Sequence, residues 1–387
     1  HRGAAEGTAE LVRRHLFVDA DVARVEGITA SDSLVPDSDI FGSRDRDDVT
    51  TWGVGPRFVY GLGSFARLQA RHRRSGTESD DRADSVTDSS FVGLSSGPVF
   101  NDWGWALSYE RREQEEESVG PARLDEDRTF ETARGELSLR AGAHTVLFAA
   151  GGTEDNEFET ATGEAVDGDF WEAGLRWNPS RTVSMEASAG ERFFGETGSF
   201  RLDVQGAVVS RRATYQETLT TRPEIESERA SFLVRDEDGN IVLGPGGEPV
   251  TVAVSIPTVR DEVILEDRAT IGLVWEHGYS RVSLDLIATE REFLESRTNE
   301  SSEGVNLGYQ WDRLTRTTVE AELGFTRLEV APTEREDEFA TARLGAVRDL
   351  DEDLDLSLDI EHSERDSTVP AREFDVNRVT LALEKVF

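Results

Sequence analysis

The sequence predicts an all-β protein, a transmembrane antiparallel up-and-down β-barrel of about 18 strands, with 16 as the alternative count. Three observations predict it: apolar and polar residues alternate with period two along the chain, connections alternate between short and mostly long, and aromatic residues lie beside the short connections. A soluble β-sandwich alternates in the same way, but it would have to accommodate many consecutive strands without a helix.

The alternation is clear near the end of the chain. Leu354, Leu356, Leu358 and Ile360 share one face of an extended segment, and acids and a serine occupy the other face. Each predicted strand is close to the ~9–11 residues that a tilted membrane-crossing strand needs, or somewhat longer. The predicted strands are residues 12–24, 50–60, 64–74, 88–97, 102–112, 129–141, 143–153, 168–177, 181–192, 198–206, 210–221, 262–275, 279–290, 302–311, 315–328, 338–348, 352–363 and 374–387.

The connections predict a single barrel over residues 1–387, with short periplasmic turns and longer acidic outer loops. An even number of strands places both chain ends on the periplasmic side. Because the chain starts at His1, we expect a processed, mature form. The longest outer loop, residues 222–261, contains a hairpin signal around Asp238-Gly239 and either narrows the pore or projects outward.

Aromatic residues beside the short turns predict a girdle at one membrane interface. Trp52, Tyr109 and Trp171 lie nearer the opposite strand ends and predict a second ring. The alternative is chance placement of aromatic residues that pack in a soluble core. The residues of the first girdle are Tyr60, Trp103, Trp177, Trp275, Tyr279 and Trp311.

The face opposite the apolar one is predicted to line the pore. Its charges permit two interpretations: a transverse field that orients charged or sugar solutes, or ionic ladders between neighbouring strands. Arg176 with Glu186, and Arg192 with Asp203, are candidate ladder pairs. The predicted lining residues are Arg57, Arg67, Arg71, Arg134, Arg140, Arg176, Arg192 and Arg201 in the first half, and Asp285, Glu320, Glu322, Asp353, Asp355, Asp359 and Glu361 in the second half.

Composition narrows the function classes. A formal charge of -36 argues against nucleic acid as a partner, because nucleic acid requires a basic face. No stretch reaches the ~18 apolar residues of a membrane helix. No HExxH or Walker motif is present, and we expect no catalytic residue, cofactor or metal ligand. His72 and His362, near the outer strand ends, are the histidines to consider for an enzyme.

One region carries a family resemblance. Phe170-Trp171-Glu172-Ala173-Gly174-Leu175-Arg176-Trp177-Asn178-Pro179-Ser180-Arg181-Thr182, the Arg192-Phe193-Phe194-Gly195 element, Tyr215 with Thr220-Thr221-Arg222, and Asp238-Gly239-Asn240 resemble an outer-membrane β-barrel family. This family is associated with the PEP-CTERM/exosortase system and with exopolysaccharide genes. The resemblance covers roughly residues 168–245. It implies an envelope role linked to surface polysaccharide, in export or anchoring, and supplies no catalytic residues.

The sequence therefore predicts a bacterial outer-membrane barrel, not an enzyme. We expect a pore, or an export or anchoring component, for surface exopolysaccharide or small polar solutes. The alternative is a docking barrel that binds a surface partner through its acidic loops without transport. Expected partners are outer-membrane lipid, polysaccharide, and the barrel-assembly machinery through the C-terminal Phe387.

Overall fold

A computed structural model describes residues 3–28, 46–79, 84–116, 126–158, 160, 166–221, 263–314, 316–331, 333–351 and 354–385. Among these residues it contains nineteen strands and one 3-10 turn, Pro370–Arg372. No helix there is long and apolar enough to cross a membrane. The strands are β1 (Gly3–Val12), β2 (Leu16–Ile28), β3 (Arg46–Leu62), β4 (Ala66–Ser79), β5 (Ser85–Ser96), β6 (Trp103–Glu116), β7 (Glu126–Arg140), β8 (Thr145–Glu157), β9 (Gly168–Ser180), β10 (Val183–Arg192), β11 (Gly195–Gln205), β12 (Val209–Thr221), β13 (Val263–His277), β14 (Ser280–Phe293), β15 (Thr298–Leu314), β16 (Thr317–Ala331), β17 (Arg335–Asp351), β18 (Leu354–Ser367) and β19 (Phe374–Lys385).

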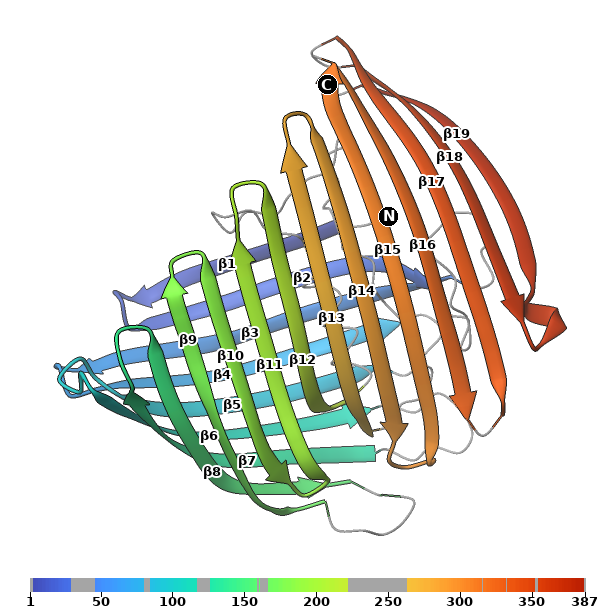
Figure 1. The fold of residues 1–387 in the computed structure, drawn as a ribbon. Coiled ribbons are helices and arrows are strands. Elements are labelled where there is room, and N and C mark those ends of the chain that lie inside the picture. Colours follow the sequence, from blue (N-terminus) through green and yellow to red (C-terminus); the bar gives the residue numbers. More distant parts are fainter. Residues whose placement is uncertain are drawn as a thin grey trace.

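Each strand pairs with the next one along the chain, and every pair is antiparallel. The up-and-down order predicted from the sequence is thereby confirmed. Figure 1 shows the sheet curled into two walls, β1–β8 behind and β9–β19 in front, whose strands cross at a steep angle. Among the described residues, no registered pair joins β1 to β19.

The structure adds one strand to the expected eighteen. The predicted first strand, 12–24, corresponds to β2, which begins at Leu16. The sequence did not predict β1, which ends at Val12 and is joined to β2 by a tight turn. An odd count places Gly3 at the end of the sheet with the long connections and Lys385 at the end with the short ones. The expectation that both chain ends lie on one side is therefore not met by the described strands. Phe387 lies outside the described residues.

The two faces of the sheet differ in the way the alternation predicts. Large apolar side chains are exposed on the convex face, for example Leu107 (56%), Leu137 (63%) and Leu381 (70%). On the concave face, side chains reach past one strand to the next but one, as Arg134 on β7 does to Glu172 on β9. Curvature brings such side chains together only on the inner side, so the polar face is the inner face.

The strands are longer than expected at the long-connection end. β14 continues to Phe293 and β15 begins at Thr298, so the predicted loop 291–301 shrinks to residues 294–297. Similarly, the predicted loop 329–337 shrinks to residues 332–334. At the short turns, Gly63 and Gly278 each adopt a φ of 63°, which side-chain-bearing residues rarely adopt. The loop 222–261 lies outside the described residues.

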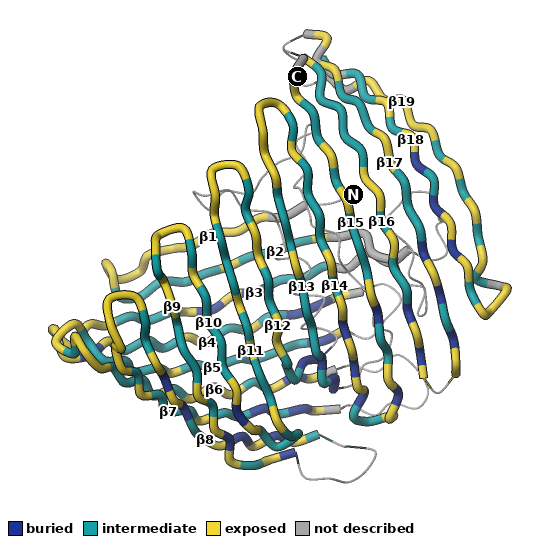
Figure 2. The backbone as a smooth tube through the Cα atoms, in the orientation of Figure 1, coloured by how far each residue is buried: buried dark blue, intermediate teal, exposed yellow. Residues whose placement is uncertain are grey.

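Buried residues gather at the long-connection ends of the strands, as Figure 2 shows. Two contacts there join strands that are not neighbours. The Thr221 hydroxyl at the end of β12 donates to Gln114 Oε1 on β6 at 2.8 Å, and Arg128 Nη2 on β7 lies 3.3 Å from Glu295 Oε1 after β14. Phe293 beside them has no exposed surface. The two walls therefore meet at this end of the sheet.

Candidate functional site: the charged inner face

The densest group of inner-face charges lies on β7–β10. Period-two alternation directs these side chains inward, and small residues make room among them. At Gly174 an added Cβ would approach Phe148 Cζ to 2.6 Å, so the glycine lets that ring lie flat across β9. The guanidinium of Arg176 then lies over the Phe148 ring, 4.3 Å from its centroid. The ring therefore supports the guanidinium of Arg176 beside its carboxylate partners.

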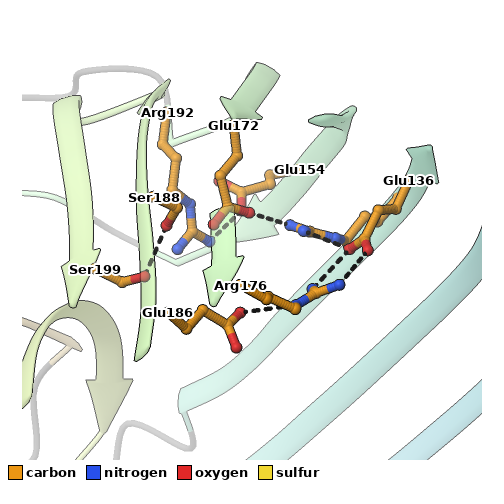
Figure 3. A network of polar contacts seen from close by, with 9 residues as sticks. Glu136, Glu154, Glu172, Arg176, Glu186, Ser188, Arg192 and Ser199 are labelled. Atoms are coloured by element: carbon orange, nitrogen blue, oxygen red, sulfur yellow. Dashed lines mark hydrogen bonds and ion pairs between the residues drawn. The ribbon is translucent and has the colours of Figure 1, made fainter. Parts of the chain in front are cut away.

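Figure 3 shows the network that results. Arg176 Nη1 lies 3.0 Å from Glu136 Oε1, and its Nε lies 3.3 Å from Glu186 Oε1. Arg134 spans Glu172 at 2.7 Å and Glu136 at 3.3 Å. Arg192 pairs with Glu154 two strands away. The network thus bridges four strands, and most of its charge is cancelled locally.

The network distinguishes the two candidate ladder pairs. Arg176 and Glu186 are register partners, so that predicted pair is confirmed. The Arg192–Asp203 pair is wrong, because Arg192 faces Gly195 and Asp203 faces Ser184. Asp203 instead accepts a hydrogen bond from Arg212 Nε at 2.7 Å. A difference of several residues in register separates the prediction from the structure.

The predicted lining arginines divide into two groups. Arg57, Arg134, Arg176 and Arg192 have carboxylate partners; for Arg57 the partner is Asp19, 2.9 Å away. The second group lies at inner-face positions of β4, β7 and β11, and among the described residues its members have no hydrogen-bonded or ion-paired side chain partner. That group is Arg67, Arg71, Arg140 and Arg201.

Two of the predicted acids of the second half pair with arginines. Asp359 accepts from Arg343 Nε at 2.6 Å, and Glu361 lies 3.6 Å from Arg378. Asp285 lies on the inner face of β14, and Glu320 and Glu322 lie on that of β16. Asp353 and the side chain of Asp355 fall outside the described residues. Both halves of the inner face therefore contain ion-pair ladders, and whether these residues line a conducting pore stays a prediction.

Sequence reasoning missed the acid partners on β2. Asp19 pairs with Arg57, and Asp21 lies 2.5 Å from Arg73, whose side chain crosses Gly53 to reach it. The signal was the alternation of Phe17, Asp19 and Asp21 in a segment otherwise rich in Val and Ala.

The predicted girdle residues lie on the outer face beside the short turns. Tyr60 is 43% exposed, Trp103 is 50% exposed and Tyr279 is 63% exposed. Trp177 and Trp275 are also exposed, and Trp311 is half-buried. Trp171 and Tyr109 are exposed on the same face, further toward the long connections. This placement agrees with two levels of aromatic residues on the outside of the sheet.

The two rim histidines lie on the outer face. His72 Nδ1 is 3.0 Å from Ser90 Oγ and its Nε2 is 3.7 Å from Asp88, while His362 Nδ1 is 3.1 Å from Asn377 Oδ1. Ser90 sits within β5, where the backbone N–H groups serve the ladders with β4 and β6. Those N–H groups are therefore not free to stabilise an oxyanion beside Ser90.

No family model and no curated protein sequence matches the chain. Solved outer-membrane receptors show a distant likeness in shape. They include the alcaligin receptor FauA of Bordetella pertussis (TM-score 0.40, 13% identity, 95% of this chain and 73% of that one). A mutant of the ferric enterobactin receptor PfeA of Pseudomonas aeruginosa gives a TM-score of 0.46 at 10% identity, with 93% and 71% coverage. The siderophore receptor PirA of Acinetobacter baumannii gives 0.42 at 7% identity, with 100% and 77% coverage.

Proposed function

We propose that this chain is an outer-membrane β-barrel through which polar solutes pass. The outer face carries the proposal: large apolar side chains are exposed there on strands throughout the sheet, with aromatic residues at two levels. In water such a surface is far larger than a monomeric soluble protein tolerates, whereas lipid would cover it. Representative residues are Val22, Val92, Leu107, Leu137, Leu147, Ile271, Leu286, Leu307, Leu323, Leu344, Leu358 and Leu381.

The inner face supports passage of polar rather than apolar molecules. Its side chains are charged, and many are partly exposed, as Arg176 (36%) and Glu186 (46%) are. Hydrated charges offer a passing solute hydrogen bonds that are readily exchanged with water. The resemblance at residues 168–245 extends the proposal to surface exopolysaccharide as the cargo, in export or anchoring.

Reconstitution tests the proposal. Purified protein refolded in detergent is expected to migrate faster on a gel before heating than after it, and to open ion-conducting channels in planar bilayers. A barrel that inserts but never conducts, even after deletion of residues 225–258, overturns passage of solutes. Deletion of the gene from its native host, followed by measurement of released and cell-bound exopolysaccharide, tests the cargo.

One observation favours a docking role as the second candidate. Glu217, Asp267 and Glu290 face one another in register across β12, β13 and β14 on the outer face, toward the long connections. Acids at that level would repel anionic surface material unless a divalent cation bridges the two. Calcium-dependent retention of surface polysaccharide by cells, lost in a Glu217→Gln, Glu290→Gln variant with unchanged conductance, would favour docking over passage.

A further inference from the structure

We propose that a hollow on the inner face of β4–β7 binds an acidic saccharide, held by Arg67 and Arg71. The inference rests on the proposed function and names the class of solute. The hollow has a volume of about 250 Å³, and its lining includes Arg67, Gln69, Phe91, Ser108, Arg134 and Glu136. Ligand pockets are usually of roughly 300–1,000 Å³, so this space suits one sugar ring of a longer chain.

The shape of the hollow follows from side-chain size. Its floor is formed by the inner-face positions of β5 and β6, where Gly93, Ser95, Ala106 and Ser108 are small. Longer side chains rise on both sides: Arg67 and Gln69 from β4, Arg134 and Glu136 from β7. The floor is continuous, because β5 and β6 are paired directly between these two walls.

The two sides of the hollow, which we call its β4 wall and its β7 wall, differ in the number of side-chain donors that are free to bind a ligand. On the β7 wall, Arg134 and Glu136 are engaged by each other, Glu172 and Arg176. On the β4 wall, Arg67 and Gln69 have no hydrogen-bonded or ion-paired side chain partner among the described residues. The same holds for Arg71, which lies just beyond the lining of the hollow as the register partner of Phe91. Arg71 also faces Arg57 in register, whose own charge is committed to Asp19. The free donors of the hollow therefore lie on one side, and they are cationic.

These donors have the chemistry for a carboxylate. A guanidinium holds a carboxylate through two parallel N–H bonds, which a neutral hydroxyl cannot match. Arg67 and Arg71 lie four residues apart on one face of β4, so their Cα atoms are separated by roughly 13 Å along the strand. That spacing lets two acidic groups on one extended chain be held at once.

Phe91 provides a flat surface between the walls. An added Cβ at Gly93 would approach Phe91 Cζ to 2.8 Å, so the ring lies over Gly93, against the floor. An aromatic surface with a few convergent polar groups is typical of small-molecule sites. The carboxylates that face this region are Glu136, already paired, and Glu110, which is the register partner of Phe91 on β6. Glu110 does not line the hollow, and an anionic group is disfavoured on its side of Phe91.

Titration calorimetry on the full-length refolded protein in detergent tests the inference. Tetragalacturonate is the acidic probe and maltotetraose the neutral one. We expect measurable binding of tetragalacturonate that weakens as salt is raised, and about tenfold or greater loss of affinity in an Arg67→Gln, Arg71→Gln variant. The matched control is Arg140→Gln, Arg201→Gln, which removes two unpaired inner-face arginines outside the hollow and is expected to change the affinity less than about twofold.

Equal losses in the two double variants would overturn the site, because net charge alone would then explain binding. Equal affinity for maltotetraose, or no binding of tetragalacturonate to folded wild-type protein, would overturn it as well. Conductance in bilayers is measured separately on the same proteins. A conducting wild-type barrel that fails the calorimetry disproves the site and leaves passage intact, whereas binding without conductance disproves passage and supports the site.

Discussion

Both ends of the sheet contain ion pairs between arginine and an acidic residue, but the pairs are buried at one end and exposed at the other. At the long-connection end, Arg365 and Asp337 are 2% and 0% exposed, and Arg291 and Glu266 are 6% and 9% exposed. At the short-turn end, Arg281 and Glu276 are 53% and 61% exposed. Breaking a buried ion pair leaves a charge without solvent, whereas an exposed pair is replaced by water. The long-connection end should therefore carry most of the polar contribution to stability.

Removal of Asp337, the acid shared by two arginines at the long-connection end, should lower the free energy of unfolding most. Asp337 accepts hydrogen bonds from Arg335 Nε at 2.7 Å and from Arg365 Nη2 at 2.8 Å. Asp337→Ala leaves two buried guanidinium groups together, and we expect it to lower the free energy of unfolding by about 3–5 kcal/mol. Asp203→Ala, which removes an exposed pair at the opposite end, should cost no more than about 1 kcal/mol. Urea unfolding followed by tryptophan fluorescence measures both, and comparable losses would contradict the contrast.

The ion pair between Arg128 and Glu295, which joins the two walls of the sheet, should affect both the free energy of unfolding and the conductance. Arg128→Ala removes the ion pair with Glu295, and we expect a loss of about 2–3 kcal/mol. Because this contact draws β7 toward β14, its loss should also raise single-channel conductance. Arg281→Ala at the short turns is the control and should leave conductance unchanged. Identical conductance in wild type and Arg128→Ala would show that the walls do not restrict the passage.

Glycine positions give a smaller and more local contrast. At Gly174 an added Cβ would approach the Ala187 carbonyl oxygen to 2.4 Å, whereas at Gly61 nothing lies within 4 Å. Gly174→Ala should destabilise the protein by about 1–3 kcal/mol, and Gly61→Ala by less than about 0.5 kcal/mol. Thermal unfolding of the two variants side by side is sufficient. A tolerated Gly174→Ala would mean that both the β10 backbone at Ala187 and the Phe148 ring can move away from the added methyl group.

The strands were largely predictable because the outer face of the sheet is apolar and the inner face is charged, which produces a period-two pattern in the sequence. β1 was not predicted because the residues at its outer positions, Ala5, Gly7 and Ala9, are too small to show the alternation. The strand ends at the long connections were not predicted because both faces of the strands are charged there, as from Glu110 to Glu116. Once the outer face leaves the apolar zone, alternation disappears although hydrogen bonding between strands continues.

The inner face was predictable in composition, but its ion pairs were predictable only between adjacent strands, as for Arg176 and Glu186. Arg192 was expected to pair with Asp203, yet curvature brings it to Glu154, two strands away. Such contacts depend on sheet radius and stagger, which no short segment encodes. The free arginines Arg67 and Arg71 could not be separated from the paired ones for the same reason.

The odd number of strands has a consequence for how the sheet can become a ring. β1 and β19 both run from the long connections toward the short turns, so a direct junction between them would be parallel. Every other junction described is antiparallel, and parallel pairing is slightly weaker per residue. In the bilayer location that we propose, hydrocarbon would leave no backbone edge unsatisfied, so the free edges of β1 and β19 would each need a partner. A junction of β1 with β19 would be parallel and therefore the weakest in the sheet, whereas an antiparallel partner at either edge would remove that weak point.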